Sequence, residues 1–119
     1  ILSYETARHL KCRAAFTEKD PVEGMALKRG FAVRPGIRTL VVEDIITTGG
    51  SVKKTIDHLR KRGAEIVGVG ALIDRSSGQA SFDCRFEALA QINLQSYPPE
   101  SCPHCAAGLD LIEPDDIVL

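Results

Sequence analysis

The residue types with the clearest chemical potential lie in one short stretch, from Thr39 to Ser51. Apolar residues open this stretch, two adjacent acids, Glu43 and Asp44, follow, and a run rich in Thr and Gly closes it. The pattern predicts a buried strand that ends on the two acids, then a short loop, then a helix. Ligands of open α/β sheets bind at the carboxyl ends of the strands. The stretch therefore predicts two acids that bind sugar hydroxyls, next to a loop that binds a phosphate.

The loop after the acids has the composition that a phosphate site requires. A bound phosphate needs several backbone N–H groups, and a helix N-terminus supplies them well. Gly49 and Gly50 allow the backbone to approach closely, and Ser51 is the predicted helix N-cap. The segment lacks the G-x-x-x-x-G-K-S/T pattern of a Walker A loop. The predicted site residues are Glu43, Asp44, Ile45, Ile46, Thr47, Thr48, Gly49, Gly50 and Ser51.

The two acids also have a plain alternative reading as ordinary loop carboxylates. For an isolated pair of acids we would favour that alternative, but next to the Thr/Gly/Ser loop the binding role is favoured. Glu43 and Asp44 can accept hydrogen bonds from vicinal ribose hydroxyls, or orient Mg²⁺ through water. Two neighbouring acids would otherwise repel each other, so a hydroxylated ligand, a metal or a cation is expected beside them.

A strand–helix–strand unit is predicted around this loop. Apolar residues at i, i+4 and i+7 from Val52 predict one helical stripe, and Gly63 predicts the helix end. The apolar run 66–73 predicts a second strand, parallel to the first and covered on both faces. Such a unit is right-handed. Arg75 follows the carboxyl end of the second strand, so it is expected on the same edge as the acids.

The segment before residue 39 is predicted to contain smaller elements. A helix is expected over 1–10, a short buried strand over 13–17, and a charged loop over 18–24. A further strand is expected over 25–33. The tight turn at 34–36 would then make a β-hairpin that leads into the main strand.

The composition sets wider limits on what the protein is. The chain has 119 residues, 44% of them hydrophobic, which suffices for one modest domain. A net charge of -1 gives no sign of an electrostatic nucleic-acid binder. No apolar run approaches the roughly 20 residues of a membrane span, and the four cysteines do not form a disulfide scaffold. We therefore expect a cytoplasmic protein.

Residues 40–51 resemble the phosphoribosyl-pyrophosphate (PRPP) motif of type I phosphoribosyltransferases, and the variant here is most similar to that of the orotate-using members. Segments 25–31, 74–76 and 102–105 agree, so the resemblance covers nearly the whole chain. It implies an α/β fold of the type I phosphoribosyltransferase kind, with a mainly parallel sheet flanked by helices and a β-hairpin or flexible-loop insertion. The expected organisation is a single domain over 1–119 whose front is absent.

The resemblance also implies a reaction and its partners. The expected activity is transfer of the phosphoribosyl group of PRPP to orotate, with release of pyrophosphate, in UMP biosynthesis. Mg²⁺ would be the cofactor, and a homodimer the usual assembly, with no nucleic acid and no membrane involved. The family's earlier pyrophosphate-contacting loop and substrate hood precede the first helix here, so these 119 residues alone are expected to be inactive or very weak.

Residue roles follow from the same resemblance. Residues 43–51 would bind PRPP, with the acids at the ribose hydroxyls and the Thr47-to-Ser51 loop at the 5′-phosphate. Thr47 and Arg75 would contact orotate. For Arg75 there is independent support, because a guanidinium suits a planar carboxylate, while its alternative is a surface arginine. Lys19 and Asp44 would be catalytic, Lys19 being the loop cation that reaches the pyrophosphate, often in the partner subunit's site.

Several alternatives stay open from the sequence. Lys28 and Arg29 could replace Lys19 as the loop cation. The enzyme could use another base, or the chain could be a non-catalytic PRPP-binding regulator, although the near-neutral charge argues against a nucleic-acid surface. Cys102 and Cys105 are interpreted as structural or incidental thiols, with zinc and redox roles as alternatives. His9 and His58 are expected to face solvent from their helices.

Overall fold

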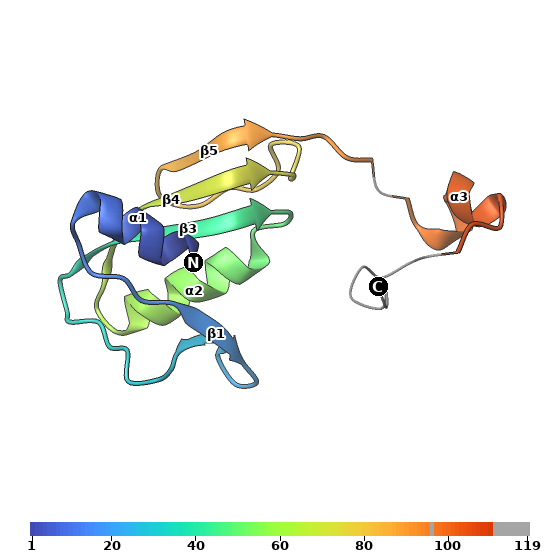
Figure 1. The fold of residues 1–119 in the computed structure, drawn as a ribbon. Coiled ribbons are helices and arrows are strands. Elements are labelled where there is room, and N and C mark those ends of the chain that lie inside the picture. The colour runs from blue at the N-terminus through green and yellow to red at the C-terminus, as the bar shows by residue number, and fades with distance from the viewer. Residues whose placement is uncertain (96, 111–119) are drawn as a thin grey trace, which may run out of the picture.

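The computed structural model describes residues 1–95 and 97–110, and Figure 1 shows their arrangement. Three parallel strands form one sheet in the order β3-β4-β5, and two antiparallel strands form a separate hairpin. The predicted α/β class is confirmed. In chain order the elements are α1 (Leu2–Leu10), β1 (Thr17–Asp20), β2 (Gly24–Leu27), β3 (Arg38–Ile46), α2 (Gly50–Lys61), β4 (Glu65–Asp74), β5 (Phe86–Gln91), the 3₁₀ helix η1 (Pro99–Ser101) and α3 (Pro103–Ala106).

The core forms where α2 packs on the sheet. β3 and β4 pair in parallel, and α2 is the crossover between them, as the sequence predicts. The predicted apolar stripe of the helix is buried, with exposed fractions of 3% at Val52, 3% at Ile56 and 5% at Leu59. Val41 and Val69 belong to the same buried cluster. Burial of this stripe fixes the helix, and therefore the loop that precedes it, on the sheet.

Strand β4 is covered on one face only within the described residues. Val69 and Ala71 are buried, whereas Val67 and Leu72 are 37% and 40% exposed. The prediction that both faces are covered is therefore wrong here. The reason is the arrangement of the helices, because α2 contacts β3 and β4 while α1 contacts β3.

The hairpin lies earlier in the chain than predicted. The range 13–16 contains no strand, and β1 and β2 occupy much of the segment expected to be a charged loop. Asp20 closes the turn, because its Oδ1 accepts hydrogen bonds from the backbone N–H groups of Val22 and Glu23, each at 3.0 Å. Gly24 then takes a φ of 74°, which glycine adopts without strain. These local hydrogen bonds outweigh the low β-propensity of the charged residues.

The turn at 34–36 is confirmed, but it does not join two paired strands. The Ile37 N–H donates to the Arg34 carbonyl at 3.1 Å, and Gly36 has a φ of 76°. The Gly36 N–H donates to the carbonyl of Gly63 at 2.7 Å. This turn therefore attaches the chain before β3 to the chain after α2. No helix among the described residues has the length and apolar character needed to cross a membrane.

We expect truncation of the helix stripe to weaken the whole fold. Ile56→Ala should lower the free energy of unfolding by about 2–5 kcal/mol, since it leaves a cavity between α2 and the sheet. The control Val67→Ala, at an exposed position of β4, should cost under about 1 kcal/mol. Urea denaturation measures both. Equal losses in the two variants would show that α2 does not form the core contact.

Candidate functional site

The loop between β3 and α2 makes a sharp turn at Gly49. This residue has a φ of 76° and a ψ of 4° and is the N-cap of α2, which begins at Gly50. The prediction of Ser51 as the N-cap is therefore wrong. The left-handed turn at Gly49 starts the helix two residues earlier, and the Lys53 N–H donates to the Gly49 carbonyl at 2.9 Å. The exposed Ser51 instead lies in the first turn, where N–H groups have no partner inside the helix.

The loop backbone is packed tightly against the chain after β4. A Cβ atom on Gly49 would lie 3.0 Å from Cζ of Phe82, which makes an edge-to-face contact with Phe86. The Gly50 N–H donates to Oγ1 of Thr48 at 3.3 Å. The loop borders a half-open cavity of about 70 Å³, lined by Glu43, Ile45, Ile46, Thr47, Thr48, Gly49, Gly50, Ser51 and Val52. It is called the anion cavity below, after the ligand proposed for it.

The two acids lie within β3 and not at its end. The pairing with β4 continues to Ile46, opposite Asp74, so the predicted strand end is wrong by two residues. Asp44 is exposed and Glu43 is partly buried. The two are in contact, because the Asp44 N–H donates to Oε1 of Glu43 at 3.2 Å. The apolar residues Ile45 and Ile46 carry the strand past the acids, and Ile46 is almost fully buried.

Glu43 has a perturbed pKa because of its surroundings in β3. Partial burial, together with the neighbouring Asp44 carboxyl, raises the pKa of Glu43 above its ordinary value of 4.5. Ligand hydroxyls or a cation placed at these carboxylates would favour their ionised forms. The pair is therefore suited to bind hydroxyl donors or positive charge.

Arg75 is placed on the same sheet edge as the loop, as the strand–helix–strand pattern predicts. Its backbone N–H donates to the carbonyl of Ile46, the last residue of β3, at 2.7 Å. Asp74 and Ser76 hold this second loop, because Oδ1 of Asp74 accepts from the Ser76 N–H at 2.8 Å. The Ser76 hydroxyl oxygen accepts from the Ala80 N–H at 2.9 Å. The exposed Arg75 thus lies on a well-supported loop whose backbone is bonded to Ile46, a residue that lines the anion cavity.

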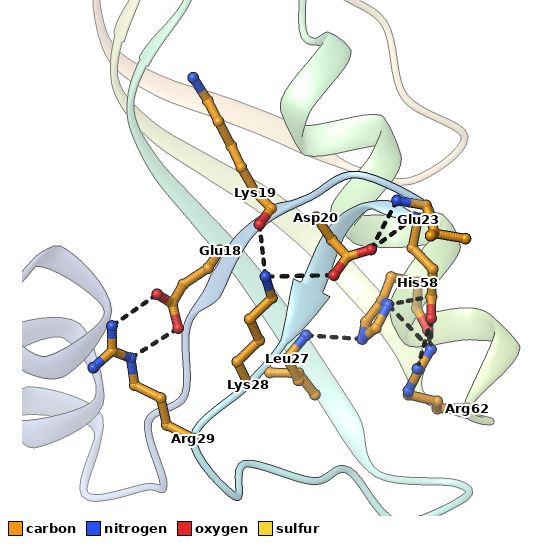
Figure 2. A network of polar contacts seen from close by, with 10 residues as sticks. Glu18, Lys19, Asp20, Glu23, Leu27, Lys28, Arg29, His58 and Arg62 are labelled. Atoms are coloured by element: carbon orange, nitrogen blue, oxygen red, sulfur yellow. Dashed lines mark hydrogen bonds and ion pairs between the residues drawn. The ribbon is translucent and has the colours of Figure 1, made fainter.

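Lys19 belongs to a second cavity, between the hairpin and the start of α2. This cavity measures about 450 Å³ and is lined by Lys19, Asp20, Pro21, Gly24, Met25, Ser51 and Lys54. Ser51 lines both cavities, so the two adjoin. Figure 2 shows the Lys19 side chain extending away from the hairpin's ion pairs.

The two alternative cations are engaged inside the hairpin region. Nζ of Lys28 donates to the Lys19 carbonyl at 2.8 Å and lies 3.4 Å from Oδ2 of Asp20. Arg29 donates two hydrogen bonds to the Glu18 carboxylate, at 2.8 and 2.9 Å. This geometry favours Lys19 over Lys28 and Arg29 as a ligand-facing cation, although its role stays a prediction.

His58 is the site-supporting residue that sequence reasoning missed. It was expected to face solvent, yet it is 2% exposed and hydrogen-bonded to the hairpin. Two exposed basic residues near the end of α2 also pair with acids, Arg62 with Glu23 and Arg60 with Asp83. The available signal was a polar helical stripe at i, i+3, i+4, i+7 and i+11, formed by Ser51, Lys54, Thr55, His58 and Arg62.

The two C-terminal cysteines lie at α3. The backbone N–H and the thiol of Cys105 lower the pKa of Cys102. Among the described residues, no three His, Cys, Asp or Glu side chains come together in a way that could hold a metal. A structural zinc site needs four ligands, so the described chain gives the zinc interpretation no geometric support.

Comparison with known proteins places this geometry in a family. A profile of the phosphoribosyl transferase domain matches residues 2–84. The chain belongs to the phosphoribosyl transferase domain family. It is 46% identical over 114 residues to an orotate phosphoribosyltransferase of Desulforamulus reducens and 49% identical over 114 residues to one of Thermotoga petrophila. These matches cover 96% of this chain but only 59% and 60% of the relatives' lengths.

Solved structures support the same fold. An orotate phosphoribosyltransferase from Aeropyrum pernix superposes with a TM-score of 0.59 at 25% identity, over 75% of this chain and 52% of that one. An adenine phosphoribosyltransferase from Rhodothermus marinus gives 0.58 at 22% identity, over 76% of this chain and 62% of the other. The predicted type I phosphoribosyltransferase fold is therefore confirmed, and the loop at 47–51 lies inside the matched phosphoribosyl transferase domain.

We expect Gly49→Ala to damage both the loop and the fold of this phosphoribosyl transferase domain. The left-handed φ alone should cost about 1–2 kcal/mol, and the overlap with Phe82 should add to that. Gly36→Ala is a matched control, because Gly36 also has a φ of 76° but has open space around it. Urea denaturation compares their stabilities, and calorimetry compares their affinities for ribose 5-phosphate. A Gly49→Ala variant that binds ribose 5-phosphate as the control does would contradict the loop's assignment.

Glu43→Gln should stabilise the protein at neutral pH when no ligand is added. Because the pKa of Glu43 is raised in the folded state, ionisation of this group lowers the free energy of unfolding as the pH rises through 4.5 to the folded pKa. The glutamine removes that penalty, so the variant should gain most above this window and converge with the wild type below about pH 4. Urea denaturation across this pH range measures the difference. A variant less stable than the wild type at pH 7 would show that the carboxylate is favourably placed.

Proposed function

We propose that the protein transfers the phosphoribosyl group of PRPP to orotate, giving orotidine 5′-phosphate and pyrophosphate. The observation that carries this proposal is the shared edge of β3 and β4, where the backbone N–H of Arg75 is bonded to Ile46, which lines the anion cavity. Relatives named orotate phosphoribosyltransferase, 44–49% identical, support the choice of base.

The reaction is a substitution at the anomeric carbon of PRPP. A ring nitrogen of orotate forms the new C–N bond, the bond to the pyrophosphate oxygen breaks with its electron pair, and the nitrogen's proton is released. The configuration at the carbon inverts. Positive charge develops on the ribose in the transition state, so nearby carboxylates such as Glu43 and Asp44 stabilise it more than they stabilise the ground state.

The loop and the arginine orient the two substrates for that substitution. Backbone N–H groups at the start of α2 and the hydroxyls of Thr47, Thr48 and Ser51 would bind the 5′-phosphate. Arg75, with Thr47, would bind orotate, since a guanidinium pairs with a carboxylate through two parallel hydrogen bonds. Holding both reactants on one edge supplies much of the rate enhancement without a covalent nucleophile.

The carboxylates of Glu43 and Asp44 are suitable ligands for Mg²⁺, which the substrate would also help to bind. Glu43 and Asp44 offer two adjacent carboxylates, and Mg²⁺ commonly combines one or two carboxylates with water and substrate phosphates. When bound, the ion would neutralise charge on the departing pyrophosphate.

The remaining parts of the proposal concern the loop cation and the assembly. Lys19 would approach the pyrophosphate from the hairpin side, in its own site or in the partner subunit's. We further propose a homodimer located in the cytoplasm that acts without nucleic acid. A net charge of -1 supports the last point and weighs against the regulator alternative.

Arg75→Ala provides the sharpest test of the proposed base. Loss of a guanidinium–carboxylate pair should lower kcat/KM for orotate by about 10- to 100-fold while PRPP affinity is kept. The control is Arg85→Ala, because Arg85 is exposed and pairs with Glu87 on the sheet. The measurement is orotate consumption, followed by ultraviolet absorbance, with PRPP and Mg²⁺.

Two outcomes would overturn this assignment. A wild-type protein that binds PRPP but consumes no orotate would indicate another base or a regulator. Unchanged orotate kinetics in Arg75→Ala would remove Arg75 from the orotate site.

A further inference from the structure

Four residues of the polar stripe of α2 attach the hairpin, and the fourth, Arg62, is described below. At the first, Oγ1 of Thr17 and Oγ1 of Thr55 share a hydrogen bond of 3.0 Å. At the second, the Lys54 side chain lies so close to Gly24 that a Cβ there would be 2.7 Å from Cδ of the lysine. The third is His58, the most buried polar residue of the helix. The hairpin is therefore docked on the helix along the length of β1 and β2.

His58 makes the deepest of these attachments, shown in Figure 2. Its Nε2 accepts a hydrogen bond from the backbone N–H of Leu27 at 2.9 Å, so Nε2 carries no proton. The proton of the neutral ring then lies on Nδ1, which donates to Oε2 of Glu23 at 2.6 Å. Both ring nitrogens thus bind the hairpin, one at each end of β2.

Arg62 completes this cluster of four residues. Its Nη2 donates to Oε1 of Glu23 at 3.1 Å, and its Nη1 donates to Oε2 of Glu23 at 3.2 Å and to the His58 carbonyl at 3.1 Å. These contacts, with that of His58, lower the pKa of Glu23, so the carboxylate stays ionised and keeps both partners. Replacing His58, Glu23 or Arg62 leaves a buried or charged partner without its hydrogen bond, whereas Leu27 contributes only its backbone N–H.

The cluster connects Lys19 of the hairpin to the loop at 47–51 through helix α2. Helix α2 begins at the loop, and the helix fixes β2 through His58. On the hairpin, Lys19 lies directly opposite Met25 in the β1–β2 register. Lys19 and Met25 both line the larger cavity, together with Ser51 of the loop. The distance between Lys19 and the loop is therefore set by how the hairpin sits on α2.

We propose that His58 is a positioning residue for phosphoribosyl transfer, which holds the hairpin so that Lys19 faces the cavity beside Ser51. This proposal rests on the proposed function. It extends that function to a residue outside the predicted site, since His58 lies in α2 and not in the motif at 40–51. Loosening the hairpin should affect the step that needs the cation and leave the loop's binding of the 5′-phosphate largely intact.

The test compares His58→Phe with His58→Gln in the full-length protein. Phenylalanine keeps a ring but removes both hydrogen bonds, whereas glutamine keeps an acceptor for the Leu27 N–H. His58→Phe should lower kcat by about 10- to 100-fold with little change in the KM for PRPP, since a displacement of 1 Å can cost that much. His58→Gln should recover a large part of the loss. His9→Phe, at an exposed histidine of α1, is the matched control.

Two further measurements separate positioning from simple destabilisation. All assays are run well below the melting temperature of each variant, and hydrogen exchange of the Leu27 amide should be faster in His58→Phe than in His58→Gln. A His58→Phe variant with wild-type kcat would overturn the proposal. So would equal kcat losses in the phenylalanine and glutamine variants.

The outcome can be separated from that of the proposed function. If the wild type consumed no orotate, the function would fail by itself, and binding of inorganic pyrophosphate would test His58 instead. A weaker pyrophosphate affinity in His58→Phe, with no further loss on adding Lys19→Ala, would support the positioning role. Independent, additive losses would contradict it.

Discussion

The parallel pairing of β3 with β4 is the constraint on which the rest of the site depends. Parallel strands bring their carboxyl ends to one edge, and the crossover between them is α2. The loop before α2 and the loop after β4 therefore meet, and the hydrogen bond from the Arg75 N–H to the Ile46 carbonyl fixes their distance. A change in register would separate the anion cavity from the arginine and leave each without its proposed partner.

Helix α2 meets two different demands with two stripes. Its apolar stripe, represented by Ile56, packs on the sheet and fixes the anion loop in place. Its polar stripe, represented by His58, carries the hairpin and with it Lys19. The same helix thus sets the positions of the loop and the cation relative to each other. Tight packing makes such an arrangement rigid, which is what orienting two reactants and a leaving group requires.

The strand–helix–strand unit was predictable because its signals are local and periodic. The anion loop and the edge position of Arg75 follow from it. The predictions that were wrong depend on contacts between distant residues, which sequence periodicity does not reveal. Ile45 and Ile46 extend β3 because β4 continues beside them. The charged residues of the hairpin are typical of a loop, and the strands form there because Asp20 stabilises the turn between them. The burial of His58 depends on Leu27, 31 positions away in sequence.

The most direct test of a shared sheet edge is an amide NMR titration of the protein with ribose 5-phosphate, followed by orotate. Ribose 5-phosphate has no pyrophosphate leaving group, so the two ligands cannot react during the titration. Ribose 5-phosphate should shift the backbone N–H signals of residues 47–51, and orotate should then shift those around Arg75 while the loop signals remain in their bound positions. Shifts confined to other surfaces, with residues 47–51 unaffected at saturating ribose 5-phosphate, would contradict the central claim that this edge holds both substrates.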